Sequence, residues 1–340
     1  MSARRSSIVL ITLTVVLAAL AAVVRFVVAP GLTKLPGDTD LTVRYAGRAT
    51  MLDDEALRSG DTAHALRSGI PVTVDRRVRV TSTHGDTAVL EDTLTTHVGG
   101  RSLPSSKTYA VDRVSREGTS SPDSTAVEPS RGALSSAFPP DAAQDDSYTY
   151  YDSTTRSVVP VRYTGSSQRQ GRTVNVYKIG VSAAVKDPEV LEPLPPALPK
   201  KLVAGLVPGL DGGTRERLTP EALSALPDPV PLAYRGESTL VGYVDRQTGI
   251  AIDQTVDRKV VATVRVGGEP VPLLPVSAVT FGITPESSDE LGDKAASAGL
   301  LLTLVTVAAP LALLAVAAVP LSVLYLRGRR RRRPAPAASA

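Results

Sequence analysis

Hydrophobic and polar positions divide the chain into two apolar ends and a long polar middle. Residues 6–24 carry no charge, and residues 8–20 are apolar on every side, without the alternation of a strand. Residues 295–326 are uncharged as well. About 20 such residues form a helix long enough to cross a bilayer. We therefore predict transmembrane helices over residues 8–29 and 295–326.

Two features of the first apolar segment leave alternatives open. Arg25 interrupts it one helix length from its start, where a long side chain can extend to the far membrane interface. A charge buried within the membrane is the alternative. Arg4 and Arg5, followed by the apolar run and by small residues at 18–22, also resemble a cleaved signal peptide. Because the apolar run continues past such a cleavage site, we favour a membrane helix.

Basic residues near the ends of the two apolar segments predict how the chain is oriented, with Arg25 at the outer edge and the others on the cytoplasmic side. These topology anchors are Arg4, Arg5, Arg25, Arg327, Arg329, Arg330, Arg331, Arg332 and Arg333. Arginines at the end of a membrane helix favour the cytoplasmic side. We therefore expect residues 1–7 and a disordered tail, 327–340, in the cytoplasm, and residues 30–294 outside the plasma membrane. Recruitment of anionic lipid or of a cytoplasmic partner is a second interpretation of the arginine block.

The middle of the chain is patterned mainly as β-strands. In residues 72–80 four valines alternate with polar side chains, and residues 260–266 behave in the same way. The predicted strands are 41–49, 70–82, 87–96, 108–112, 157–163, 173–181, 231–244, 250–266 and 271–283. We expect a mainly β, antiparallel, barrel- or sandwich-like extracytoplasmic domain with few short helices.

Helical signals in this domain are few. Residues 219–226 begin with a capping threonine and a proline, and residues 51–66 have a looser helical pattern. Residues 188–199 are rich in proline, which predicts an extended connector. We place a candidate boundary there, between subregions 30–187 and 200–294.

Composition and charge exclude several classes of function. The 340 residues are 42% hydrophobic and 4% aromatic, with three His and no Cys. Disulfides, thiolate metal sites and a cysteine nucleophile are therefore excluded. All 34 acidic residues lie between Asp38 and Asp293, so the basic character belongs to the ends and the middle is mildly acidic. This distribution does not favour binding of nucleic acid.

A short motif recurs at three places, residues 111–118, 151–156 and 244–249. In each, a strand pattern ends at an aspartate, which can cap its own turn, and two copies end on a glycine. The hairpin-turn residues that we single out are Asp112, Arg113, Asp245, Arg246 and Gly249. A turn explains these residues without catalysis, and an Asp–Arg pair in a hydrolytic site is the alternative.

Catalytic and metal-binding patterns are weak. The histidines are His64, His84 and His97, and their spacing does not build a helical zinc site. The one acidic cluster consists of Asp141, Asp145, Asp146 and Asp152. It lacks the spacing of a calcium loop, so we interpret it as a solvated loop. Nucleophile-elbow, Walker and dinucleotide motifs are absent. We therefore expect no enzyme activity, no cofactor and no metal.

The order of several short motifs between the two apolar ends resembles the actinobacterial PorA-family membrane proteins, a family of largely unknown function. These motifs are residues 109–113, 138–140, 148–152, 159–160, 163–165, 174–177 and 242–249. Phe138-Pro139-Pro140 departs from the Phe-Pro-Phe-like motif expected there. The arrangement is also similar to that of CD36-type scavenger receptors, whose two terminal spans carry a β-rich domain with a lipid tunnel. That similarity is an analogy of architecture.

The leading hypothesis is a non-enzymatic protein, integral to the membrane, whose external domain binds or hands on an apolar cell-envelope molecule such as a lipid. A structural envelope component that binds a protein partner is the second hypothesis. An oligomeric porin-like channel is the third, because two helices cannot enclose a pore within one chain.

Overall fold

A computed structural model describes residues 2–59, 61, 64–122 and 125–331. Contacts divide the chain into two compact units. One consists of Leu35–Ala295, and the other of the two terminal segments, Met1–Lys34 and Ala296–Ala340. We describe each unit separately.

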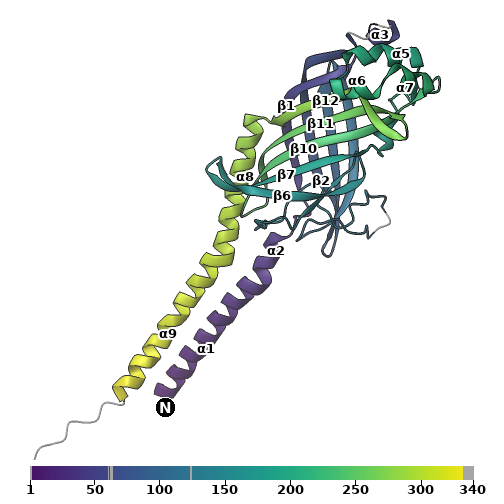
Figure 1. The fold of residues 1–340 in the computed structure, drawn as a ribbon. Helices are drawn as coiled ribbons and strands as arrows, with labels where there is room; N and C mark the ends of the chain where they lie inside the picture. The colour runs from purple at the N-terminus through teal and green to yellow at the C-terminus, as the bar shows by residue number, and fades with distance from the viewer. Residues whose placement is uncertain (1, 60, 62–63, 123–124, 332–340) are drawn as a thin grey trace, which may run out of the picture. The chain divides into compact units, whose positions relative to one another are not determined.

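The terminal unit contains the two apolar helices that the sequence predicts. The first runs through α1 (Ser2–Val23), the π-helix η1 (Val24–Val28) and α2 (Ala29–Thr33). The second runs through α8 (Pro285–Thr303), the π-helix η4 (Leu304–Ala308) and α9 (Ala309–Arg331). Segments Leu10–Thr33 and Pro285–Leu326 are long and apolar enough to cross a membrane, and α1 and α9 lie side by side (Figure 1). Helix α9 continues to Arg331, so the tail predicted to be disordered from residue 327 begins as helix.

A proline follows each of the two π-helices at the same spacing. Segment η1 ends two residues before Pro30, and η4 ends two residues before Pro310. Proline has no N–H for the carbonyl one turn earlier, and its ring collides with that carbonyl in a regular helix. A wider turn removes the collision, so the sequence accounts for both irregularities.

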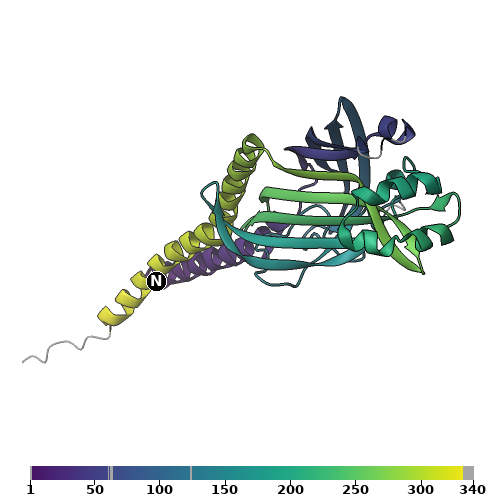
Figure 2. The same cartoon turned by 45° about the horizontal axis from the view of Figure 1, so that its top comes forward.

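The Leu35–Ala295 unit is built on one ten-stranded antiparallel sheet, which confirms the mainly β fold class predicted from alternation. Its strands are β1 (Asp40–Leu52), β2 (Leu66–His84), β3 (Thr87–Val98), β4 (Arg101–Asp112), β5 (Thr149–Asp152), β6 (Ser157–Arg169), β7 (Arg172–Ala184), β10 (Ala233–Asp245), β11 (Ala251–Val266) and β12 (Glu269–Ile283). The strand order is β4-β3-β2-β1-β12-β11-β10-β7-β6-β5. The sheet is curled, with the early strands facing the later ones (Figures 1 and 2).

The two faces of this sheet differ in composition. Register pairs Tyr45 of β1 with Val74 of β2, and both side chains are buried with Val43 and Val72 in one apolar cluster. The positions between them, such as Arg44, are exposed. Side chains alternate between the two faces of a strand. We therefore call the apolar side the inner face and the charged side the outer face.

A loop and an ion-pair cluster link the edge strands β4 and β5. Isolated backbone pairs lead from one strand to the other. Val111 of β4 pairs with Gly118, and Glu117 pairs with Leu134. Leu134 in turn pairs with Tyr150 of β5. On the same side, Lys107 of β4 forms ion pairs of 2.9 Å with Asp187 and Glu189, which follow β7. These contacts join β4 to β5 through the loop and β4 to the segment after β7.

Short helices cover one end of the sheet (Figure 1). They are α4 (Pro188–Leu191), α5 (Lys200–Leu206), the 3-10 helix η3 (Val207–Gly209), α6 (Gly212–Arg217) and α7 (Pro220–Ala225), accompanied by the small strands β8 (Ala197–Leu198) and β9 (Val230–Pro231). Val203 and Leu218 of this group pack against Val264 and Val271 of β11 and β12. Thr219 caps α7, in the segment where the sequence predicts a helix.

One expectation needs correction. Residues 51–66 do not form one continuous helix, because β1 continues to Leu52 and β2 begins at Leu66, and the α-helix described between them, α3 (Asp54–Ser59), is short. Leu52 pairs with Leu66 in the β1–β2 ladder, so strand pairing overrides a weak local preference. Strand β7 pairs with β10 across the connector 188–199, so the strands on both sides of the predicted subregion boundary belong to one sheet.

Candidate functional site

The inner face of the sheet carries charged side chains among its apolar ones. Arg76 of β2 donates to Asp92 of β3 through Nε and Nη2, at 2.9 and 2.5 Å. The Ser136 hydroxyl also donates to Asp92, which is 5% exposed. Burial alone would lower the pKa of Arg76, but the charge and the hydrogen bonds of Asp92 raise that pKa well above its usual range. The pair is therefore a fully formed, bidentate, buried ion pair.

A second arginine on this face lacks such a partner. Arg258 of β11 approaches Asp152 at 3.7 Å, which is beyond hydrogen-bond distance. The approach is to Oδ1, whereas the other carboxylate oxygen of Asp152, Oδ2, accepts from the backbone N–H and the hydroxyl of Thr155 at 2.9 and 2.8 Å. The Nε atom of Arg258 is buried without a hydrogen-bond partner. Among the described residues, Arg258 therefore has an ion-pair partner in Asp152 but no hydrogen-bond acceptor for its Nε.

Phenol groups lie close to these charges. The Tyr45 hydroxyl donates to Gln254 Oε1 at 3.2 Å, and burial raises the pKa of Tyr45. Burial also raises the pKa of Tyr150, with a contribution from Asp152 that Arg258 opposes. Both phenols stay neutral at ordinary pH and can act as hydrogen-bond donors.

Aromatic rings from the loop between β4 and β5 cover the adjoining part of the inner face. Phe138 stacks on Tyr177 of β7 with centroids 4.6 Å apart, and Tyr148 meets both rings edge-on. The Tyr177 hydroxyl donates to the carbonyl of Ala143 at 2.5 Å, and Asn175 Nδ2 donates to that of Ala142 at 3.0 Å. Burial raises the pKa of Tyr177 to about 12. The loop is thus fixed to the sheet by packing and by hydrogen bonds.

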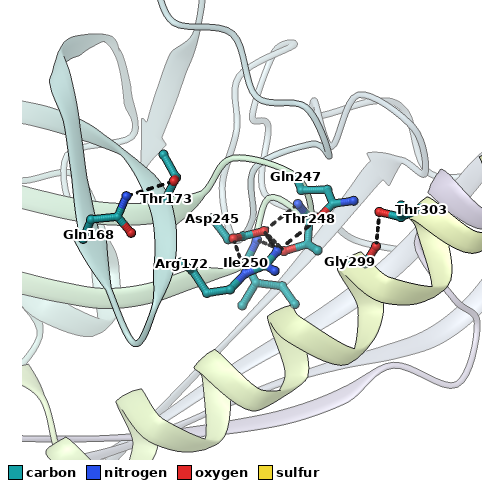
Figure 3. Close-up of polar contacts among 9 residues, drawn as sticks. All are labelled: Gln168, Arg172, Thr173, Asp245, Gln247, Thr248, Ile250, Gly299 and Thr303. Carbon is teal, nitrogen blue, oxygen red and sulfur yellow. Dashed lines mark hydrogen bonds and ion pairs between the residues drawn. The ribbon is translucent and has the colours of Figure 1, made fainter. Parts of the chain in front are cut away.

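The structure places the hairpin-turn aspartates at strand ends, where each caps a turn. Asp112 accepts from the N–H groups of Val114 and Ser115 at 2.8 Å. Asp245 accepts from the N–H and the hydroxyl of Thr248 at 2.8 and 2.7 Å, and from Arg172 at 2.9 and 3.1 Å (Figure 3). Asp245 thus accepts four hydrogen bonds and Asp112 two, which suits a structural turn better than a reactive group.

The other motif residues are separated rather than gathered. Arg113 donates to the carbonyls of Leu35 and Gly85, Arg246 is exposed, and Gly249 adopts a φ of 75°. A surface pocket of about 400 Å³ lies at the Asp245 corner. Its lining residues are Asp141, Gly171, Arg172, Thr173, Asp245, Arg246 and Gln247. The Arg172–Asp245 pair neutralises the charge at its centre.

The remaining candidates are dispersed over the surface. His64 contacts Asp61 at 2.8 Å and His97 contacts Asp75 at 3.4 Å, so each has one acidic neighbour. In the described part of the chain, no three His, Asp or Glu side chains are grouped in a way that could hold a metal ion. Arg25 lies in η1 with an exposed side chain. The side chains of Arg4, Arg5, Arg327 and Arg329–Arg331, and all of Arg332 and Arg333, lie outside the described residues.

The turns in the acidic loop account for its other aspartates. Asp146 accepts from Arg162 at 2.6 Å and from the N–H of Tyr163 at 2.8 Å. Asp145 accepts from the N–H of Ser147 at 3.0 Å. These carboxylates face different partners and do not converge on one point.

Our sequence interpretation missed the inner-face arginines, although the pattern contains a signal for them. Arg76 stands two residues after Val74, and Arg258 stands midway between Val256 and Val260. In a strand with a two-residue period, these positions share the apolar face. An arginine in that register is a candidate for a buried or ligand-binding charge.

The chain matches one family model, described as "Porin PorA", over residues 6–325. No curated protein matches it. Solved structures that align with it include a "MaoC-like dehydratase", 11% identical over 73% of this chain and 76% of that chain, with a TM-score of 0.14. A conserved protein of unknown function with a hot dog fold, from Alicyclobacillus acidocaldarius, is 14% identical over 74% and 82%, with a TM-score of 0.13. At such scores neither structure bears on the fold or the function of this chain.

Proposed function

The chain belongs to the PorA porin family, and from that premise we propose that it is a membrane-anchored, non-enzymatic protein of the cell envelope whose β domain binds or hands on an apolar envelope molecule such as a lipid. The family match and the two apolar helices support membrane association. Binding of a lipid by the β domain goes beyond membrane association and needs its own argument.

The observation that supports lipid binding is the character of the inner face. This face is apolar, and some of its side chains are only partly buried. Leu240, Val279 and Phe281 point to this face and stay partly exposed. Exposed apolar surface inside a curled sheet favours an apolar ligand, because covering that surface removes it from water.

Extraction of the purified protein tests this proposal. The full chain would be purified in a mild detergent and extracted with organic solvent, and the extract analysed by mass spectrometry. We expect one lipid class in roughly stoichiometric amount, enriched over the lipids of the host membrane. Protein that purifies empty and takes up no lipid from an envelope extract would contradict the proposal.

A porin-like channel is a second candidate, favoured by the family description itself. Two helices do not enclose a pore in one chain, so conduction requires several copies. Apolar side chains such as Ile11, Val15 and Leu311 are exposed and can contact lipid or another copy. Conductance steps in a planar bilayer, scaling steeply with protein concentration, would support this candidate. Pure protein without conductance would eliminate it. A stable partner that co-purifies with an empty domain would instead favour a partner-binding envelope component.

A further inference from the structure

Two arginines occupy the inner face of the sheet, and their surroundings differ in one respect. Arg76 satisfies its guanidinium with Asp92 through two hydrogen bonds. For Arg258, no hydrogen bond from the guanidinium to any residue in the described part of the chain is found, and its Nε is buried. Buried donors without acceptors are rare in folded proteins, since each loses its hydrogen bonds to water. The described part of the chain therefore leaves the buried Nε of Arg258 without an acceptor, which a ligand can supply.

The carboxylate that pairs with Arg258 is held in place by another interaction. Asp152 is 3.7 Å away and accepts two hydrogen bonds from Thr155, which fix it at the turn after β5. The side chain of Arg258 is nevertheless 38% exposed, although it points to the inner face. The side chain is thus partly open to solvent although its Nε is buried, and Asp152 compensates its charge from beyond hydrogen-bond distance.

The surroundings of Arg258 combine polar and apolar groups. Register places Ser238 of β10 and Val279 of β12 beside it, and Val256 and Val260 flank it along β11. Tyr150, whose hydroxyl is a neutral donor, lies within the electrostatic reach of Arg258. A small free anion would leave the valines uncovered. A molecule with an anionic group and an apolar chain would use both parts of this surface.

From this geometry we propose that Arg258 binds the anionic group, a carboxylate or a phosphate, of an amphiphile that lies along the inner face of β10, β11 and β12. The fork of a guanidinium matches two oxygens of such a group. This inference rests on the proposed function and adds the chemistry of the head group to it.

Photolabelling of the full chain in detergent tests the site. The probes are a 16-carbon fatty acid with a diazirine on its chain and the matching alcohol, and labelled peptides are identified by mass spectrometry. We expect the acid to label β10–β12 peptides and the alcohol to label them at least about tenfold less, since a charge-assisted hydrogen bond is lost. An equal concentration of sodium acetate should not compete.

Two neighbouring variants separate the arginine from a general loss of structure. Arg258→Gln should reduce labelling by the acid about tenfold or more, whereas Arg258→Lys, which keeps the charge, should give an intermediate loss. Lys259→Gln is the matched control, because Lys259 is next in sequence, points to the outer face and pairs with Glu237 at 3.0 Å. It should label like the unchanged protein. Thermal unfolding of each variant verifies that the fold is retained.

The possible results distinguish this inference from the proposed function. Equal labelling of the inner face by acid and alcohol, unchanged in Arg258→Gln, would overturn the head-group site and leave lipid binding in place. Failure of both probes to label the inner face would overturn both proposals. Competition by acetate would assign Arg258 to a small free anion and overturn the amphiphile.

Discussion

Gly249 packs directly against the backbone of Pro139. A Cβ atom added to Gly249 would lie 2.4 Å from the carbonyl oxygen of Pro139 and 2.5 Å from that of Phe138. Gly249 also adopts a φ of 75°, which favours glycine. The contact joins two distant motifs, the β10–β11 turn and the loop that carries Phe138 onto the inner face. A residue that ends a turn therefore also positions the aromatic cover of the sheet.

This relationship predicts that Gly249→Ala is strongly destabilising. The substitution combines backbone strain with a collision against main-chain atoms that cannot rotate away, so we expect a loss of about 3 kcal/mol or more. Gly85→Ala is the matched control, because Gly85 has a φ of 58° with nothing within 4 Å of an added Cβ. It should lose only about 1–2 kcal/mol. Equal effects in thermal unfolding would show that the Pro139 contact contributes nothing.

Asp92→Asn should destabilise the domain by about 3–5 kcal/mol, because it leaves the buried charge of Arg76 without its counterion. Replacing both partners, as in Arg76→Met with Asp92→Leu, should restore much of the loss. The outer-face pair Arg77–Asp40 provides the control, since both side chains are about half exposed. Asp40→Asn should leave the unfolding midpoint in urea almost unchanged. An Asp92→Asn variant as stable as the unchanged protein would contradict our account of the inner face.

The sequence predicts the scaffold better than the site, for physical reasons. Alternation and apolar length are local signals, so the strands and the two long helices can be recognised one segment at a time. The pairing of Arg76 with Asp92, and the lack of a partner at Arg258, depend on which strands become neighbours. That order is a property of the whole sheet. The position of the Phe138 loop also depends on a distant contact, because the loop packs against Gly249, more than one hundred residues later.

The raised pKa of Tyr177 predicts that the folded protein loses stability at alkaline pH. That pKa is raised to about 12 in the folded state, above the ordinary value of 10.0, so the folded protein holds the phenolic proton more tightly than the unfolded chain does. Its contribution is constant below about pH 10 and falls as pH rises from about 10 to 12. Tyr177→Phe should flatten the pH dependence of stability in that window and remove one phenolate signal that appears near pH 12. An unchanged ultraviolet titration would contradict this assignment.

The predicted orientation can be tested because the chain contains no cysteine. Single substitutions such as Asp257→Cys, on the exposed outer face of β11, and Ser339→Cys, near the C-terminus, give unique labelling sites. A thiol reagent that does not cross membranes should label intact cells at residue 257 and not at residue 339. After the cells are permeabilised, the reagent should label residue 339 as well. The reverse pattern would refute an extracytoplasmic β domain.

Two glycines on adjacent strands allow the inner and outer faces to be compared directly. Gly242 of β10 faces inward, and the only side chains within 4 Å of an added Cβ belong to Leu240 and Val244 of its own strand. Gly180 of β7 faces outward, with nothing within 4 Å. Valine suits a strand at both positions. Gly242→Val and Gly180→Val therefore add the same bulk to opposite faces, at a buried position in β10 and at an exposed one in β7.

If a lipid occupies the inner face, Gly242→Val should lower the amount of lipid that co-purifies to about half or less, because the added methyl groups take up space that the ligand needs. Gly180→Val should retain the full amount. Thermal unfolding of both variants, with Gly242 buried and Gly180 exposed, separates a loss of bound lipid from damage to the fold. Equal lipid content in the two variants would place the bound lipid elsewhere, for example on the apolar helices, and would contradict binding on the inner face of the sheet.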